Sequence, residues 1–153
     1  MKVRGHHLVC VYCFHGSRKA TAGEFFGVDN AIPGLLARLR ADPEIEIEVI
    51  ADSDEVCDAC PLRRPEGCGR SADVKAQSEK LRKWDRLILD RLGLAPGDKI
   101  RARELERIIR LRIPDIGEIC ANCSSASPSG WREFRDAIRE GFWPASPASR
   151  QSL

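Results

Sequence analysis

The longest periodic stretch of the sequence is SADVKAQSEKLRKWDRLILDRLG, at residues 71–93. Its large apolar side chains recur every three or four residues, at Leu81, Trp84, Leu87/Ile88 and Leu92. This spacing places them on one stripe of an α-helix, and such a stripe packs against a core. Gly93 follows at the position where a left-handed residue closes many helices. The sequence therefore predicts a long helix over about 71–92 as the main element of the fold.

Shorter patterns predict three more helices and a small sheet. Three apolar groups at helical spacing mark the helices: Leu35, Leu36 and Leu39; Leu105, Ile108 and Ile109; and Trp131, Phe134, Ile138 and Phe142. Prolines at 43 and 114 should end the first two. The run IEIEV at 45–49 alternates apolar and acidic residues, which is typical of a strand with one face in water. Residues 2–3 and 99–101 are the candidate partner strands.

The composition is that of one ordinary globular domain. The chain has 153 residues, of which 42% are hydrophobic and 31% charged, with a net charge of +2. A chain of this size buries about 68–70% of its unfolded surface. We predict a single small domain over residues 1–143, with an α+β fold that is mainly α-helical. The tail at 144–153 has nothing to bury, and we expect it to be disordered.

The sequence also argues against a membrane or secreted protein. No apolar run approaches the roughly 18 residues of a membrane span. The N-terminus has a basic start but lacks the small-residue cleavage pattern of a signal peptide. We therefore expect a cytoplasmic protein without a membrane partner, in a compartment that keeps thiols reduced.

Cysteine is used far beyond the needs of packing. The seven cysteines fall into three groups: Cys10-x2-Cys13, Cys57-x2-Cys60-x7-Cys68 and Cys120-x2-Cys123. Two intervening residues let the chain fold back so that both sulfurs face one centre. A single cysteine is best explained as a small buried side chain. Repeated pairs instead favour a metal site over buried thiols or disulfides, and the minor β element would be organised around it.

The densest group supplies three sulfurs within twelve residues, at Cys57, Cys60 and Cys68. A tetrahedral site needs a fourth ligand from elsewhere in the chain. Its candidates, in order of preference, are Cys120 or Cys123, then Cys10, with Cys13 last. Four thiolates leave a metal centre negatively charged, and Arg63, Arg64 and Arg70 could neutralise part of that charge. We expect the acidic side chains before Cys57 to lie mostly on the solvent face.

The spacing does not by itself identify the metal. A compact zinc ribbon separates its knuckles by about 15–20 residues, whereas 59 residues separate Cys60 from Cys120. Three clustered cysteines with one remote partner suit a four-iron cluster at least as well. We therefore predict an iron–sulfur cluster of the 4Fe-4S type, with Zn²⁺ as the alternative.

Two histidines precede the first cysteine pair. If residues 5–14 are helical, His6, Cys10 and Cys13 share one face and His7 lies on the neighbouring flank. The histidines could then be ligands or could activate a thiol. They could equally be structural groups bonded to the backbone, since adjacent histidines point in different directions. Both interpretations stay open.

The order of these motifs resembles that of the domain-of-unknown-function family 1284. The matching segments are Arg4-Gly5-His6-His7-Leu8-x-Cys10, Cys57-x-x-Cys60-Pro61, Cys68, Leu92-Gly93-Leu94-x-x-Gly97 and Cys120-x-x-Cys123. The family consists of small bacterial and archaeal proteins, and the resemblance implies the binding of an iron–sulfur cluster. It points to the cysteines of these segments as site residues and to the histidine pair as a family signature.

Other functional classes have less support. Residues 99–112 carry six basic and two acidic residues and could track phosphates, but the overall charge of +2 argues against nucleic acid. The chain has no recognisable hydrolase or transferase motif, and the βαβ pattern of a thioredoxin-like enzyme is missing. We predict electron transfer or redox sensing with an unidentified redox partner protein. The alternative is a structural Zn(Cys)4 protein that serves as a binding module, with nucleic acid as one conceivable target.

Overall fold

The computed structural model describes residues 1–114, 116, 117, 119, 120 and 128–143, apart from the side chains of 128–131. These residues form seven helices and five short strands. The helices are α1 (Gly5–Ser17), α2 (Ala22–Phe26), α3 (Ile32–Ala41), α4 (Glu55–Asp58), α5 (Val74–Leu92), α6 (Ala102–Arg112) and α7 (Pro128–Glu140). The strands are β1 (Lys2–Arg4), β2 (Glu46–Ile50), β3 (Arg63–Arg64), β4 (Gly67–Cys68) and β5 (Lys99–Arg101). The predicted α+β, mainly α-helical fold is confirmed.

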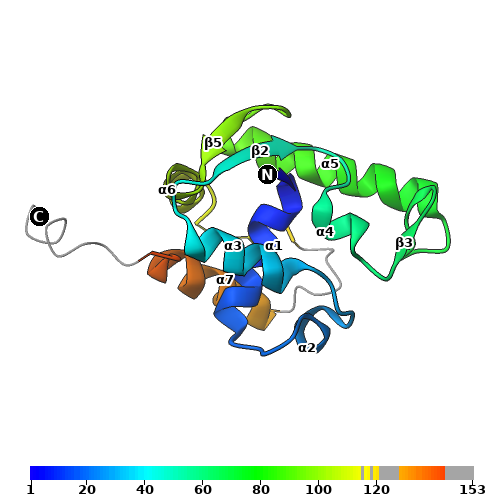
Figure 1. Cartoon of the computed structure of the whole chain (residues 1–153), viewed down its shortest axis with the longest axis horizontal. Coiled ribbons are helices and arrows are strands. Elements are labelled where there is room, and N and C mark those ends of the chain that lie inside the picture. Colours follow the sequence, from blue (N-terminus) through cyan, green and yellow to red (C-terminus); the bar gives the residue numbers. More distant parts are fainter. Residues whose placement is uncertain (115, 118, 121–127, 144–153) are drawn as a thin grey trace, which may run out of the picture.

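The three predicted strands form one sheet in the order β1-β2-β5. Strand β1 is parallel to β2, with Val3 opposite Val49, and β5 is antiparallel to β2, with Ile100 opposite Ile47. The alternation predicted for β2 is present, because Ile47 and Val49 are buried whereas Glu46 is exposed. In Figure 1 the strands β2 and β5 lie above α1, and α7 lies beside the lower half of α1.

Helix α1 occupies the centre of the molecule. Its buried side chains lie on all sides and include Leu8, Val9, Val11, Tyr12 and Phe14. A helix that is apolar all round must be covered on every face. Here α3, α5 and α7 pack against it. The N-terminal segment is therefore a core element, and whatever polar groups it carries are placed by the packing of the whole domain.

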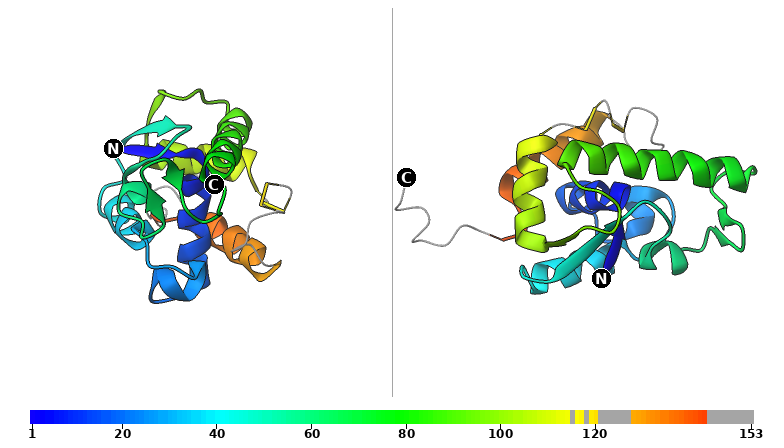
Figure 2. Two further views of the ribbon diagram at one scale, coloured as in Figure 1. Left: turned by 90° about the vertical axis from the view of Figure 1, so that its right-hand side faces the viewer. Right: turned by 90° about the horizontal axis from the view of Figure 1, so that it is seen from above.

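Helix α5 follows the prediction closely. Leu81, Ile88 and Leu92 are buried, and Gly93 closes the helix with a φ of 73°. Leu87, the alternative to Ile88 on the stripe, is 43% exposed. The N-terminal end of α5 lies beside the β3–β4 hairpin and its C-terminal end lies beside α6, as Figure 2 shows.

Helix α7 ends earlier than its apolar pattern suggests. It stops at Glu140, and Gly141 adopts a φ of 76°, so Phe142 lies beyond the helix although it is buried. The backbone N–H of Phe142 donates to Oε2 of the buried Glu106 (2.8 Å), as does the hydroxyl of Tyr12 (2.8 Å). This carboxylate on α6 therefore ties α1 to the end of α7.

Some predictions fall on the rest of the chain. The expected disordered tail at 144–153, the side chain of Trp131 and Cys123 lie outside the described residues. In the described part, no helix has both the length and the apolar character needed to cross a membrane.

The turn at Gly141 can be tested against a matched glycine. A Cβ at Gly141 would lie 2.6 Å from Oε1 of Glu106, whereas a Cβ at Gly93 would meet open space, and both residues have left-handed backbones. Gly93→Ala should cost about 1 kcal/mol of unfolding free energy from backbone strain alone. Gly141→Ala should cost about 1–3 kcal/mol more, because Glu106 is held in place. Urea unfolding measures the free energy of unfolding of both variants. Equal losses would contradict the claim that the Glu106 side chain is held in place beside Gly141.

Candidate metal centre

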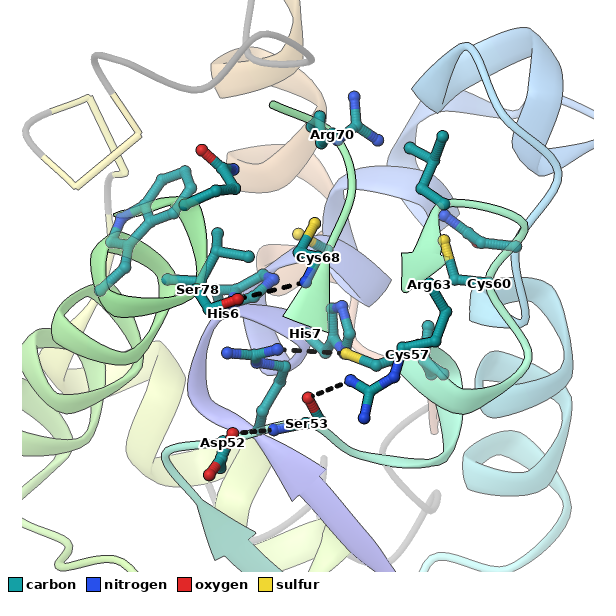
Figure 3. A pocket seen from close by; sticks show the side chains of 18 of the residues that line it. His6, His7, Asp52, Ser53, Cys57, Cys60, Arg63, Cys68, Arg70 and Ser78 are labelled. Carbon is teal, nitrogen blue, oxygen red and sulfur yellow. Dashed lines mark hydrogen bonds between the residues drawn. The ribbon is translucent and has the colours of Figure 1, made fainter. Parts of the chain in front are cut away.

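One pocket gathers most of the chemically active side chains. Four cysteines line it: Cys10, Cys57, Cys60 and Cys68. The cavity has a volume of about 320 Å³. It lies between α1, α4 with the residues that follow it, the β3–β4 hairpin and α5. Figure 3 shows Cys57, Cys60 and Cys68 approaching this space from different segments. None of the six described cysteines is in a disulfide.

Local structure explains how the dense cysteine group comes together. Asp54 caps α4, since its Oδ1 accepts from the backbone N–H of Cys57 (3.1 Å). The N–H of Cys60 donates to the carbonyl of Cys57 (3.0 Å), which makes a tight turn between the two thiols. The following hairpin pairs Arg63 with Cys68 and so returns the third thiol to the pocket. All three cysteines therefore line the same pocket.

The remaining cysteines separate into two environments. Cys10, the second choice for the fourth ligand, lines the pocket from α1. Cys120, one of the first choices, is 6% exposed within the hydrophobic core and does not border the pocket. Cys13, which had the weakest claim, is likewise in the core. Among the described cysteines, Cys10 is therefore the one that shares the pocket with Cys57, Cys60 and Cys68, and Cys123 lies outside the described residues.

The floor of the pocket is a buried charge network that the sequence analysis missed. The guanidinium of Arg4 donates through Nε and Nη2 to Oδ2 of Asp85 (3.0 and 2.8 Å). Its Nη1 donates to Sγ of Cys57 (3.1 Å), and its backbone N–H donates to Oδ2 of Asp54 (3.0 Å). Burying a charge is costly unless it is paired, and here Arg4 and both carboxylates have partners.

Asp54 is an exception to the expectation that the acidic run lies mostly in solvent. It is 4% exposed, whereas Asp52, Glu55 and Asp58 are exposed. Its carboxylate is buried because it caps α4 and accepts hydrogen bonds from Cys57, Arg4 and His7. Asp85 also left a signal in the sequence, because it interrupts the apolar stripe of α5 between Leu81 and Ile88. A charged residue on a buried stripe indicates a buried partner.

Both histidines bond to this network, each through a different carboxylate, as the expectation that adjacent histidines point in different directions suggests. Nδ1 of His6 lies 2.8 Å from Oδ1 of Asp85, and Nδ1 of His7 lies 2.8 Å from Oδ2 of Asp54. The two rings meet edge to face at 4.4 Å, and His6 also stacks on Trp84 at 5.7 Å. Both histidines line the pocket. The bonds that hold the two rings are therefore side-chain bonds to buried carboxylates and not bonds to the backbone.

Burial sets the protonation states of these groups. Burial, with a smaller contribution from His7, lowers the pKa of His6 to about 4 although Asp85 opposes the shift. At neutral pH the His6 ring is therefore uncharged. Burial alone would raise the pKa of Asp54, but hydrogen bonds from His7, Arg4 and Cys57 outweigh it and hold that pKa below its usual range. Burial raises the pKa of the Cys57 thiol, and Arg4 partly offsets this. A metal that binds Cys57 must therefore displace a proton.

Basic residues border the opening. Arg63, Arg70 and Lys80 line the pocket, and Arg63 donates to the hydroxyl of Ser53 (2.6 Å). Of the three arginines expected to offset a negative metal centre, Arg63 and Arg70 are thus in position. Arg64 instead donates to backbone carbonyls of its own loop.

Comparison with known proteins places the chain in a family. Residues 28–128 match the family described as "Protein of unknown function (DUF1284)", and the chain belongs to it. The resemblance noted from the sequence motifs is confirmed. No curated protein and no solved structure matches the chain. The family match covers Cys57, Cys60 and Cys68 and also the later pair at 120 and 123, but begins after the histidines and Cys10.

The buried network predicts a large stability effect at Asp85. Asp85→Asn keeps the size of the side chain but leaves the Arg4 guanidinium buried without its charged partner. We expect a loss of about 3–5 kcal/mol in the free energy of unfolding. Asp90→Asn, at an exposed position on the same helix, should change it by less than about 0.5 kcal/mol. Urea unfolding at equal metal content measures the free energy of unfolding of both variants. A loss at Asp85→Asn as small as that at Asp90→Asn would contradict a stabilising role for the Arg4–Asp85 ion pair.

Proposed function

We propose that the protein binds an iron–sulfur cluster, of the 4Fe-4S type, and acts in electron transfer or redox sensing. The observation that supports the proposal is that four cysteines from two distant parts of the chain line one pocket. The thiols of Cys57, Cys60 and Cys68 would hold the cluster, with a fourth ligand from α1. When bound, the cluster would supply one-electron chemistry.

The spacing of the donors favours a cluster over a single zinc ion. Among the described residues, three ligand atoms come within 4.8 Å of one another only at His7, Asp54 and Cys57. At least one pair of sulfurs among Cys57, Cys60 and Cys68 is therefore farther apart than that. The sulfurs of a tetrahedral zinc–thiolate site are about 3.8 Å apart, as follows from Zn–S bonds of about 2.3 Å. A multinuclear cluster spreads its thiolates over several metal ions and suits the wider arrangement.

The protein's own groups would also stabilise such a centre. The Arg4 guanidinium donates to Sγ of Cys57, and hydrogen bonds to cluster sulfurs tune the reduction potential. Arg63, Arg70 and Lys80 at the opening offset negative charge. A centre that depends on thiols also suits a reducing compartment, so we place the protein in the cytoplasm.

The basic stretch around α6 does not favour nucleic acid as the partner. Its arginines are mostly engaged with carboxylates on the described surface: Arg101 and Arg103 with Glu44, Arg107 with Glu104, and Arg110 with Glu106. Each such pair carries no net charge, so this surface offers phosphates less positive charge than its arginines alone would supply. We therefore propose a redox protein as the partner.

Metal analysis tests this function directly. Anaerobically purified protein should be brown, contain iron and acid-labile sulfide, and bleach with dithionite. Cys60→Ser should lose most of the iron, because it removes a pocket thiol. Cys13→Ala, the control in the core, should keep it. Colourless protein with one equivalent of zinc would refute the cluster, and iron retained by Cys60→Ser would refute this ligand set.

A further inference from the structure

We propose that Nε2 of His7 is the fourth ligand of the metal centre, so that three thiolates and one imidazole hold the metal. This inference rests on the proposed function and decides between the two kinds of donor that α1 brings to the pocket. Those donors are the thiol of Cys10 and the imidazoles of His6 and His7, all of which line the pocket.

The hydrogen bond at Nδ1 prepares His7 for this role. Nδ1 lies 2.8 Å from Oδ2 of Asp54, a buried carboxylate that can only accept, so the ring proton belongs on Nδ1. The lone pair is then on Nε2, at the opposite edge of the ring. Histidines that ligate metals almost always donate their other N–H to a carboxylate or carbonyl in this way, which fixes the ring and makes it a better ligand.

Asp54 itself is suited to positioning and not to ligation. Its two oxygens already accept from three N–H groups, those of Arg4, Cys57 and the His7 ring. The same carboxylate thus orients the imidazole and begins the helix that carries the Cys57 thiol. A ring nitrogen of His7, a carboxylate oxygen of Asp54 and Sγ of Cys57 all lie within 4.8 Å of one another, so the imidazole and the thiol meet at this carboxylate.

The neighbouring ring holds His7 in place. His6 is wedged between Trp84, on which it stacks, and His7, which it meets edge to face. Its own Nδ1 is held by Asp85. The His7 side chain is 11% exposed, so its remaining open edge belongs to the pocket and not to bulk solvent.

Charge also favours an imidazole over a fourth thiolate. The fully buried groups beside the pocket are two carboxylates, Asp54 and Asp85, against one guanidinium, Arg4. A fourth thiolate would add another negative charge to this group, whereas a neutral imidazole adds none. Histidine in place of cysteine raises the potential of an iron–sulfur centre, so the reduced state would be easier to reach.

Nitrogen hyperfine spectroscopy tests the proposal in the unaltered protein. We expect the dithionite-reduced cluster to show a strong coupling to one nitrogen. Growth with [15N]histidine should convert that signal from the 14N to the 15N pattern. A cluster with full iron and sulfide content but no coupling from histidine would overturn the proposal while leaving the proposed function intact.

Matched variants then assign the histidine. His7→Asn keeps an N–H at about the position of Nδ1, and so the bond to Asp54, but has no atom at the position of Nε2. We expect it to lose the nitrogen coupling and to release iron to a chelator at least about tenfold faster. His15→Asn, which changes a histidine of α1 outside the pocket, should match the wild type within about twofold. Loss of the cluster in Cys10→Ala together with its retention in His7→Asn would make Cys10 the ligand and overturn the proposal.

The metal found in the protein separates the two proposals. If the protein holds zinc and no iron, the proposed function fails, and X-ray absorption at the zinc edge decides the ligand. A shell with one nitrogen at about 2.0–2.1 Å and three sulfurs at about 2.3 Å would support His7, and an all-sulfur shell would overturn it. Protein that retains neither metal refutes both.

Discussion

The buried pair between Arg4 and Asp85 is the interaction on which the arrangement of the pocket depends. Arg4 ends β1 and immediately precedes α1, and its guanidinium is almost fully buried. A buried guanidinium needs partners for its donors, and Asp85 on α5 and Cys57 on α4 provide them. Gly5 shows how close this junction is, because a Cβ there would lie 2.5 Å from the carbonyl oxygen of Asp85. The first turn of α1 is therefore locked against α5.

The lock determines what the first turn of α1 presents. His6 and His7 follow Arg4 directly, and each finds a carboxylate of the same network, Asp85 or Asp54. One turn later Cys10 lines the same pocket. Residues separated by about 50 to 80 positions in the chain thus converge because one cation must be neutralised. The proposed metal centre would bind at that point of convergence.

Much of the fold followed from local patterns, and the pocket only in part. The alternation at 45–49, the stripe of α5 and the stop at Gly93 depend on neighbours in sequence, so they could be predicted. The roles of Arg4 and Asp54 could not, since the sequence does not show whether a charged residue is solvated or paired across the fold. Asp85 interrupts an apolar stripe, which indicates that it is buried, but the sequence does not show which residue is its partner. The fourth donor is equally hard to predict, because spacing shows that cysteines are paired but not which pair lies beside Cys57, Cys60 and Cys68.

The central claim is that metal binds in the pocket between α1 and the segment 57–68, which carries Cys57, Cys60 and Cys68. Differential alkylation with mass spectrometry tests it most directly, by comparing thiol reactivity in the metal-loaded and the metal-stripped protein. The account predicts that Cys57, Cys60 and Cys68 are protected only when metal is bound, while the reactivity of Cys120 is the same in both states. Metal-dependent protection of Cys120 and Cys123, with Cys57, Cys60 and Cys68 reacting equally in both states, would contradict it.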